Sequence, residues 1–185
     1  ADGAQATHLE RHLGAEVEQV AAVVAVVGKR QRFVVETLLE QAEENPFLTR
    51  FYQSPSQYAL QTQLFFLFQR AEQVRALAQN ELFSPVRVSD FLLQKDRLFA
   101  ELNLDRDEFA LYDNVYRHLA PQAPRPDLVI YLQAPSQVLL QRIQRRGLIH
   151  EKSISADYLN RLNEAYARFF HFYDEAPLLI VNATD

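Results

Sequence analysis

A continuous apolar stretch constrains the fold of this chain more than any other feature. Residues 127–132 read Asp-Leu-Val-Ile-Tyr-Leu, without the polar alternation of a strand that has one face in water. Such strands are typical of parallel sheets that helices cover on both faces. Helices are predicted on its carboxyl side at 135–146, where Gly147 ends the first, and at 155–173. The chain therefore alternates strands with helices.

The remaining segments extend this alternation. Short apolar or β-branched runs predict strands, and longer stretches with apolar residues at helical spacing predict helices. Asp105 and Glu108 form a capping-box pattern at the start of one helix. The predicted strands are 32–36, 37–40, 86–89 and 178–181, and the predicted helices are 55–80, 90–102 and 105–118. This order predicts an α/β fold with a doubly wound, parallel, five-stranded sheet flanked by helices.

The first 31 residues differ in composition from the rest. They are rich in Ala, Val and Gln and hold three of the four glycines of the 185-residue chain. We expect residues 1–31 to be an extension of unknown role and residues 32–185 to be one domain.

Charge and composition exclude several classes of protein. With 19 basic and 24 acidic residues the net charge is −5, so no basic surface for nucleic acid is expected. The absence of cysteine excludes disulfides, a thiolate nucleophile and a cysteine zinc site. The longest apolar run, Val20 to Val27, is too short to span a bilayer. The default expectation is a cytoplasmic protein that binds neither nucleic acid nor membrane.

Several short motifs occur in a characteristic order from Leu39 to the end of the chain. They are Glu40, Glu43 to Phe47, Phe51-Tyr52, Tyr58 to Leu67, Val88-Ser89-Asp90, Asp96, Arg142 to Gly147, and Glu151. Together they resemble the deoxynucleoside kinase family, specifically its bacterial deoxyguanosine/deoxyadenosine kinase-like members. The resemblance implies a P-loop kinase-like fold, a homodimer, and Mg²⁺-dependent transfer of the γ-phosphate of ATP to a deoxynucleoside 5′-hydroxyl. A purine deoxynucleoside is favoured.

The resemblance assigns catalytic roles to four residues. Glu40 follows a strand end, where open α/β sheets bind their ligands, and matches the carboxylate that takes the 5′-hydroxyl proton. Asp90 matches the aspartate of the family's Asp-Arg-Ser motif. Arg142 and Arg146 lie one helical turn apart and match lid arginines that reach the transferring phosphate. The alternatives are a solvated glutamate and a helix end favoured by the macrodipole.

Five more residues match positions that bind the nucleoside. Tyr52 and Glu151 match the pair that holds the sugar 3′-hydroxyl. Gln63 lies among apolar neighbours and matches the glutamine that pairs with the base edge, with Gln61 as its rival. Arg70, two turns further along the same helix, and Asp96 match a pair beside the base. A structural ion pair is the alternative for these two residues.

The chain departs from the family at three places. Phe91 stands where the family has an arginine, so that cation is missing or is replaced, for example by Lys95. Leu148 occupies a lid arginine position. Finally, no Gly-x4-Gly-Lys-Ser/Thr phosphate loop follows the first strand, and Gly28-Lys29 precedes it.

The missing loop leaves two interpretations. We infer that a phosphate loop and its helix, about twenty residues, belong between Glu36 and Thr37 and are absent from this chain. Without them the flanking strands lack the crossover that parallel strands need. If the deletion is real, the protein is a nucleoside-binding pseudokinase without catalysis, or an interaction module. A thymidylate-type nucleotide kinase is a further alternative, although the acidic residues from Glu40 to Glu44 disfavour a phosphorylated acceptor.

Overall fold

Five strands form one sheet in the order β2-β3-β1-β4-β5. This computed structural model describes residues 23–27, 35–78, 86–120, 124–147, 151 and 153–184. The strands are β1 (Val23–Val27), β2 (Val35–Leu38), β3 (Val86–Ser89), β4 (Leu128–Gln133) and β5 (Leu178–Asn182). The predicted α/β class and five-stranded sheet are confirmed. Five residues of the predicted extension belong to the sheet, and its residues 1–22 lie outside the described part.

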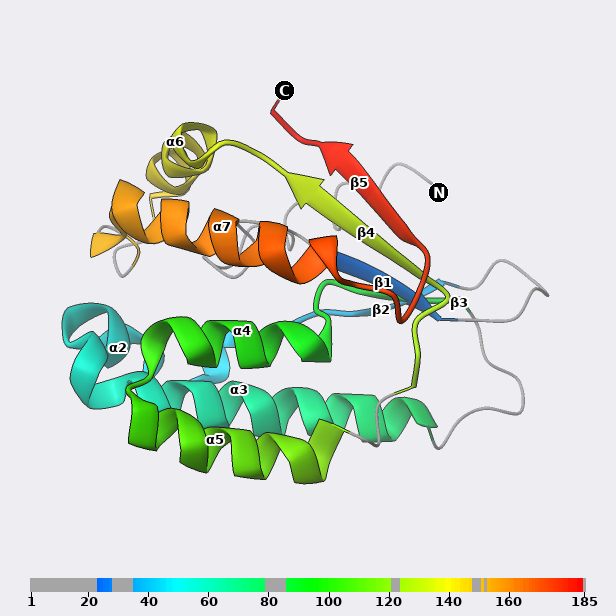
Figure 1. The fold of residues 1–185 in the computed structure, drawn as a ribbon, viewed down its shortest axis with the longest axis horizontal. Coiled ribbons are helices and arrows are strands. Elements are labelled where there is room, and N and C mark those ends of the chain that lie inside the picture. Colours follow the sequence, from blue (N-terminus) through cyan, green and yellow to red (C-terminus); the bar gives the residue numbers. More distant parts are fainter. Residues whose placement is uncertain are drawn as a thin grey trace.

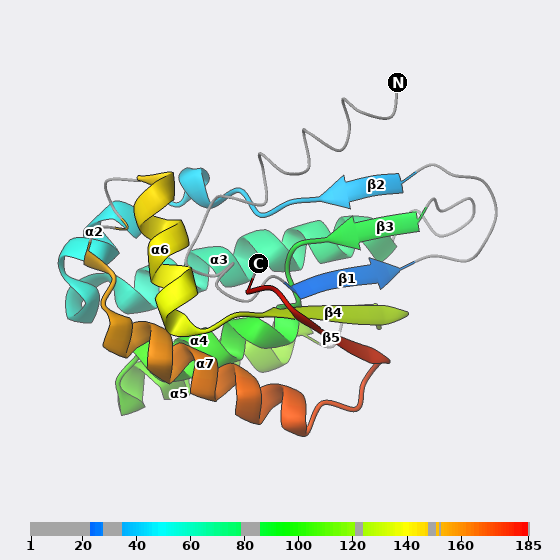
Figure 2. The same cartoon turned by 90° about the horizontal axis from the view of Figure 1, so that it is seen from above.

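One strand departs from the predicted parallel arrangement. Strands β2 and β3 are parallel, as are β4 and β5, whereas β1 runs antiparallel to both β3 and β4 (Figure 2). Only residues 28–34 connect β1 to β2. A connection this short returns the chain to the end of the sheet at which β1 finishes, so β2 must run in the opposite direction. Parallel strands need a longer crossover, usually with a helix.

The two strands predicted at 32–36 and 37–40 form a single strand instead. Strand β2 runs through Glu36 and Thr37, which pair in register with Arg87 and Val88 of β3. The strand is continuous because the two residues are bonded and both are extended, which leaves no room for a crossover helix. The phosphate loop expected between Glu36 and Thr37 is therefore absent from the fold of this chain.

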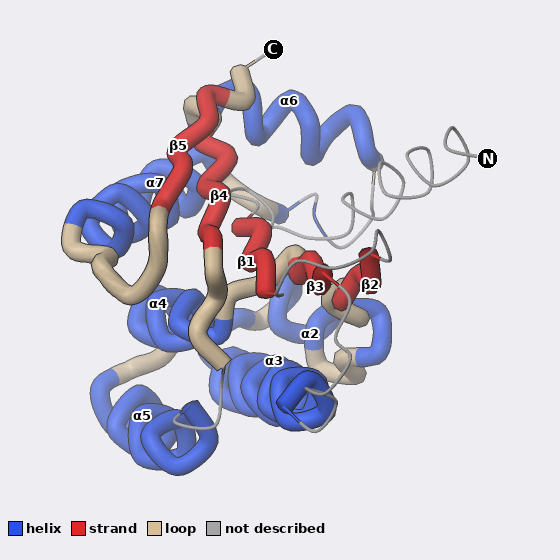
Figure 3. The backbone as a smooth tube through the Cα atoms, turned by 90° about the vertical axis from the view of Figure 1, so that its right-hand side faces the viewer, coloured by secondary structure: helices blue, strands red, loops and turns tan. Residues whose placement is uncertain are grey.

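Helices cover one face of the sheet in two layers. In Figures 1 and 3, α3, α4 and α7 lie beside the sheet, and α5 packs outside α3 and α4. The helices are η2 (Ala42–Glu44), α2 (Leu48–Gln53), α3 (Pro55–Ala78), α4 (Leu93–Asn103), α5 (Arg106–Leu119), α6 (Ser136–Arg146) and α7 (Ala156–His171). The largest core cluster joins Val129 and Tyr131 of β4 to Leu159, Tyr166 and Phe170 of α7.

Local chemistry explains several helix boundaries. The Asp105 carboxylate accepts from the backbone N–H groups of Asp107 and Glu108, and the Glu108 side chain accepts from the Asp105 N–H, which completes the predicted capping box. Ser155 Oγ caps α7 by accepting from Tyr158 N–H. Gly147 ends α6 at φ 73°, a left-handed conformation that glycine adopts without strain. Within the described part of the chain, no helix is both long and apolar enough to cross a membrane.

Candidate active site

Glu40 and Asp90 meet where β2 and β3 end. Asp90 follows β3, and its backbone N–H donates to Leu38 O of β2 at 3.3 Å. The Glu40 backbone N–H in turn donates to Asp90 Oδ1 at 2.9 Å. Parallel pairing of β2 with β3 brings these ends to one edge of the sheet, at the arrowheads of both strands in Figure 2. Glu40 and Asp90, fifty residues apart, are thus held together at the position where α/β sheets bind ligands.

A buried arginine connects this edge to the helices. Arg70 on α3 donates through Nη2 to Glu40 Oε1 and through Nη1 to Asp96 Oδ1 on α4. The side chains of Arg70 and Asp96 are each 1% exposed, and that of Glu40 is 5% exposed. Charge-assisted bonds of this kind are strong where water is excluded. The predicted Arg70–Asp96 pair is present, and it extends to Glu40.

Aromatic rings surround the Arg70 guanidinium. Its Cζ lies 5.0 Å from the Phe66 ring centroid and 6.0 Å from that of Phe91, within the range of a cation–π interaction. Phe91 stands where the family has an arginine. The Arg70 guanidinium, which comes from α3, lies over the Phe91 ring. Lys95, the suggested replacement, is 1% exposed. Sequence analysis did not identify Phe66, although it precedes Arg70 by one helical turn.

The environment of Asp96 makes it hard to ionise. Burial raises its pKa from 3.8 to about 6, while the charges of Arg70 and Lys95 and the bond from Arg70 lower it. Burial is the dominant cause. Asp96 thus titrates close to neutral pH, which is unusual for an aspartate and typical of functional sites.

Gln63 presents an unsatisfied acceptor near this network. The residue is 3% exposed and lies two helical turns before Arg70 on α3, and its Oε1 has no hydrogen-bond partner among the described residues. Asp96 Oδ2 is also buried without a partner there. Buried polar atoms are normally satisfied, so these two oxygens require a donor that a ligand can provide. Gln61, the rival candidate, is exposed.

A second group of predicted residues lies around Glu151. Arg146 at the end of α6 donates to both Glu151 oxygens, from Nη2 at 2.6 Å and from Nε at 3.1 Å. The Glu151 residue is 1% exposed. Ser153 Oγ donates to the Tyr52 carbonyl at 3.2 Å, which ties α2 to the segment after Glu151. The structure thereby brings the chain at Tyr52 close to Glu151.

Two further positions match lid positions of the family, Arg142 and Leu148. Arg142 is exposed on α6, one turn before Arg146. Leu148 lies outside the described residues. The hydrogen bonds thus define one group of Glu40, Arg70, Asp90 and Asp96. Apart from it, Arg146 pairs with Glu151, and Ser153 bonds to the Tyr52 backbone.

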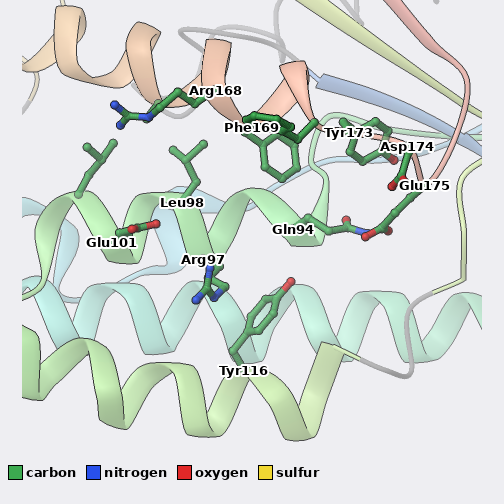
Figure 4. Close-up of a pocket in the computed structure, with 13 residues that line it drawn as sticks. Gln94, Arg97, Leu98, Glu101, Tyr116, Arg168, Phe169, Tyr173, Asp174 and Glu175 are labelled. Carbon is green, nitrogen blue, oxygen red and sulfur yellow. The ribbon is translucent and has the colours of Figure 1, made fainter.

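A cavity of about 650 Å³ lies apart from these groups. It is bounded by α4, α5, α7 and the turn after α7, and Arg97, Tyr116, Arg168 and Phe169 point toward it (Figure 4). None of the predicted site residues lines it. Its size alone does not make it the active site, because the perturbed aspartate and the unsatisfied oxygens lie elsewhere.

The described residues contain no group of three or more metal-ligating side chains. At the sheet edge the Glu40 backbone, and not its carboxylate, contacts the Asp90 carboxylate. A divalent cation would therefore need most of its oxygen ligands from a substrate, as Mg²⁺ usually does at phosphoryl-transfer sites.

The chain is similar to known proteins over most of its length. The family model described as Deoxynucleoside kinase matches residues 18–185. A deoxyguanosine kinase of Bacillus subtilis (strain 168) is 32% identical over 158 residues, which cover 84% of this chain and 76% of the relative. A deoxyadenosine kinase of Dictyostelium discoideum is 32% identical over 140 residues, which cover 72% of this chain and 55% of the relative.

Solved structures show the same similarity. Deoxyadenosine kinase from M. mycoides, in a structure with the products dCMP and dCDP, has a TM-score of 0.71 at 26% identity. The match covers 80% of this chain and 78% of that one. The same enzyme with bound dATP has a TM-score of 0.70 and the same coverage.

Proposed function

Because this chain belongs to the deoxynucleoside kinase family, we propose that it transfers the γ-phosphoryl group of ATP to the 5′-hydroxyl of a deoxynucleoside, with purine deoxynucleosides favoured. The observation that carries the proposal is the buried network of Glu40, Arg70 and Asp96. It joins a carboxylate at the sheet edge to buried polar side chains on α3 and α4. A reacting hydroxyl and a nucleobase need those two features a few ångströms apart.

Glu40 is the general base in this proposal. Arg70 occupies its Oε1, which leaves Oε2 to accept the proton of the 5′-hydroxyl as the oxygen attacks phosphorus. The Asp90 carboxylate fixes the backbone of Glu40 through the bond to its N–H. Asp90 therefore positions the base.

The nucleobase is held by Gln63 and Asp96. Gln63 Oε1 and Asp96 Oδ2 are acceptors without partners in the described chain, and the amino and ring N–H groups of a purine are donors. Arg70 contributes a fixed positive charge beside them. Tyr52 and Glu151 bind the 3′-hydroxyl of the sugar, the phenol as donor and the carboxylate as acceptor.

Arg142 and Arg146 act on the phosphate. ATP supplies the phosphoryl group, and Mg²⁺ bound with it would neutralise phosphate charge. Guanidinium groups from α6 add positive charge at the transferring group. The residues present fit the nucleoside better than they fit ATP, since the sequence has no glycine-rich phosphate loop.

The same protein is proposed to form a homodimer in the cytoplasm. Phe68 on α3 and Leu111 on α5 are each 54% exposed, and both helices lie on the side of the molecule away from β5 (Figure 3). Large apolar side chains exposed on neighbouring helices favour contact with a second copy.

A second candidate function is nucleoside binding without catalysis. The observation that favours it is the continuity of β2 through Glu36 and Thr37, which excludes a phosphate loop at that point. The base and sugar residues are present in either case. The two functions therefore differ only in whether ATP is consumed.

One experiment separates these functions. The purified chain is titrated with each of the four common deoxynucleosides in a calorimeter, and is then incubated with Mg²⁺, γ-labelled ATP and the same nucleosides. Label in a nucleoside monophosphate confirms the kinase and ranks the bases. Binding without transfer of label supports the binding protein. Neither binding nor transfer overturns both candidates.

A further inference from the structure

Two glutamines on α3 hold the backbone on either side of Glu40. Gln73 Nε2 donates to the Leu39 carbonyl at 3.3 Å, and Gln69 Nε2 donates to the Gln41 carbonyl at 3.3 Å. Gln69 Nε2 also donates, at 3.2 Å, to a glutamate carboxylate of the following helix η2. The residues immediately before and after Glu40 in the chain are therefore both bonded to α3.

This segment of the chain depends on side chains for its backbone hydrogen bonds. Residues 39–41 lie between the end of β2 at Leu38 and the start of η2 at Ala42, and they belong to neither element. Backbone groups outside regular structure must find partners in side chains, in water or in other loops. The Glu40 N–H donates to the Asp90 carboxylate. The backbone around Glu40 is thus tied to the sheet edge on one side and to α3 on the other.

The amide groups of both glutamines are oriented for donation. Oε1 of Gln69 and Oε1 of Gln73 are buried and have no hydrogen-bond partner among the described residues. Turning either amide over would set its oxygen against the carbonyl oxygen that Nε2 now binds, and two acceptors do not bond. A buried acceptor without a donor is itself costly. The fold accepts that cost at both positions and uses the donor end of each amide.

One face of α3 carries these two glutamines together with the other site residues of that helix. At about 100° per residue, Gln63, Gln69, Arg70 and Gln73 fall within an arc of about 120°. The rise of 1.5 Å per residue puts Gln73 about 15 Å along the helix axis from Gln63. A single helix therefore fixes Glu40 relative to the amide that is proposed to bind the nucleobase.

We propose that Gln73 and Gln69 are positioning residues for Glu40, and that they fix the backbone from which its carboxylate reaches the 5′-hydroxyl. The role of Glu40 as general base rests on the proposed function, whereas the contacts to its backbone do not. Arg70 holds Oε1 of the same side chain, so the backbone and the carboxylate are both constrained. A general base must lie within hydrogen-bond reach of its proton, so a shift of about 1 Å lowers turnover more than affinity.

Gln73→Met tests this arrangement in the protein without nucleoside. Methionine keeps the length of the side chain and removes the donor. Hydrogen exchange of the Glu40 backbone N–H, followed by NMR, is expected to be about fivefold faster than in the unmodified chain. Gln73→Lys restores a donor and should recover most of the protection. The matched control is Gln57→Met, an exposed glutamine in the first turn of the same helix. Unchanged exchange at Glu40 in Gln73→Met overturns the proposal.

Kinetics give a readout that a loss of stability alone does not move. In Gln73→Met the kcat for phosphoryl transfer should fall about 10-fold, while the nucleoside Kd changes less than about twofold, because Gln63 and Asp96 are unaltered. Recovery of kcat in Gln73→Lys ties the effect to the donor. Equal kcat in Gln73→Met and Gln57→Met overturns the proposal. If the unmodified chain transfers no phosphate, the proposed function fails, and the exchange rates at Glu40 still decide whether the glutamines hold its backbone.

A second variant applies if Gln73→Met does not fold. Gln69→Met removes the donor at the more exposed of the two contacts. Exchange of the Glu40 N–H should then be about threefold faster than in the unmodified chain, because only one of the two flanking carbonyls is released. Exchange at the rate of the unmodified chain would contradict the proposal.

Discussion

Arg70 on α3 forms a buried ion pair with Glu40, thirty residues earlier in the chain. The same guanidinium binds Asp96 on α4. One cation therefore links the proposed general base to the proposed base-recognition pocket. A change at either carboxylate alters the electrostatic environment of the other, because both share a charge in a region from which water is excluded.

Glu40→Gln tests the general base. The amide keeps the size of the side chain and an acceptor for Arg70 but cannot take a proton. Phosphoryl transfer should fall at least ~100-fold, with nucleoside affinity changed only a few-fold. Single-turnover kinetics and calorimetry give the two numbers. The exposed Glu43→Gln serves as control and should behave as the unmodified protein. Equal activity in both variants would remove Glu40 from the mechanism.

Arg70→Gln tests the contribution of the shared cation to stability. It leaves Glu40 and Asp96 buried without their partner, so the free energy of unfolding should fall by about 3–5 kcal/mol. Urea unfolding at pH 7 measures the change. Arg106→Gln, an exposed arginine in the first turn of α5, should change stability by less than about 0.5 kcal/mol. Similar losses in the two variants would contradict a special role for Arg70.

The pKa of Asp96 predicts a pH-dependent stability. Its value of about 6 in the folded protein lies above 3.8, so the folded state binds the proton more tightly than the unfolded chain. The resulting stabilisation is complete below about pH 4 and is lost as the pH rises through 6. Relative to Asp96→Asn, the unmodified protein should lose about 2 kcal/mol of unfolding free energy between pH 4 and pH 7. Parallel urea titrations measure this difference, and Asp157→Asn, an exposed aspartate, should show no such trend.

Glu151→Gln tests recognition of the sugar. If Glu151 accepts from the 3′-hydroxyl, the variant should bind deoxynucleosides about 10- to 100-fold more weakly, as expected for loss of a hydrogen bond to a charged group. A 3′-deoxy analogue lacks that hydroxyl, so its affinity should barely change. Calorimetry with both ligands separates this effect from disruption of the Arg146 pair, which would weaken both equally.

Asp105→Ala tests the capping box of α5. The change removes the acceptor for two backbone N–H groups and should lower the unfolding free energy by about 1–2 kcal/mol. Asp105→Asn keeps an acceptor oxygen in the same place and should retain most of the stabilisation by the cap. Thermal unfolding of the three proteins ranks them, and an alanine variant as stable as the asparagine variant would contradict the predicted contribution of the cap.

Patterns within short segments predicted much of this fold. The strand at 86–89, the helix from Pro55, the cap at Asp105 and the glycine stop at Gly147 all appear as expected. Each depends on the chemistry of a few neighbouring residues. The choice of Gln63 over Gln61 also agrees with burial, since only Gln63 lies inside.

The direction of β1 and the continuity of β2 were not predicted. An apolar pentapeptide such as Val23–Val27 forms a central strand in either direction, and the length of the following connection decides which. A phosphate loop was expected between Glu36 and Thr37 because an all-parallel sheet needs a crossover there. Strand β2 instead runs through both residues without a break.

The sequence by itself determined where helices and strands form and which residue types the site contains, because periodicity, caps and motif spacing act between neighbours along the chain. Only the tertiary structure decided that Arg70 reaches Glu40 as well as Asp96. These contacts join residues 30 and 26 positions apart, on separate elements. Their existence depends on how the helices pack on the sheet and on one another, which no local pattern encodes.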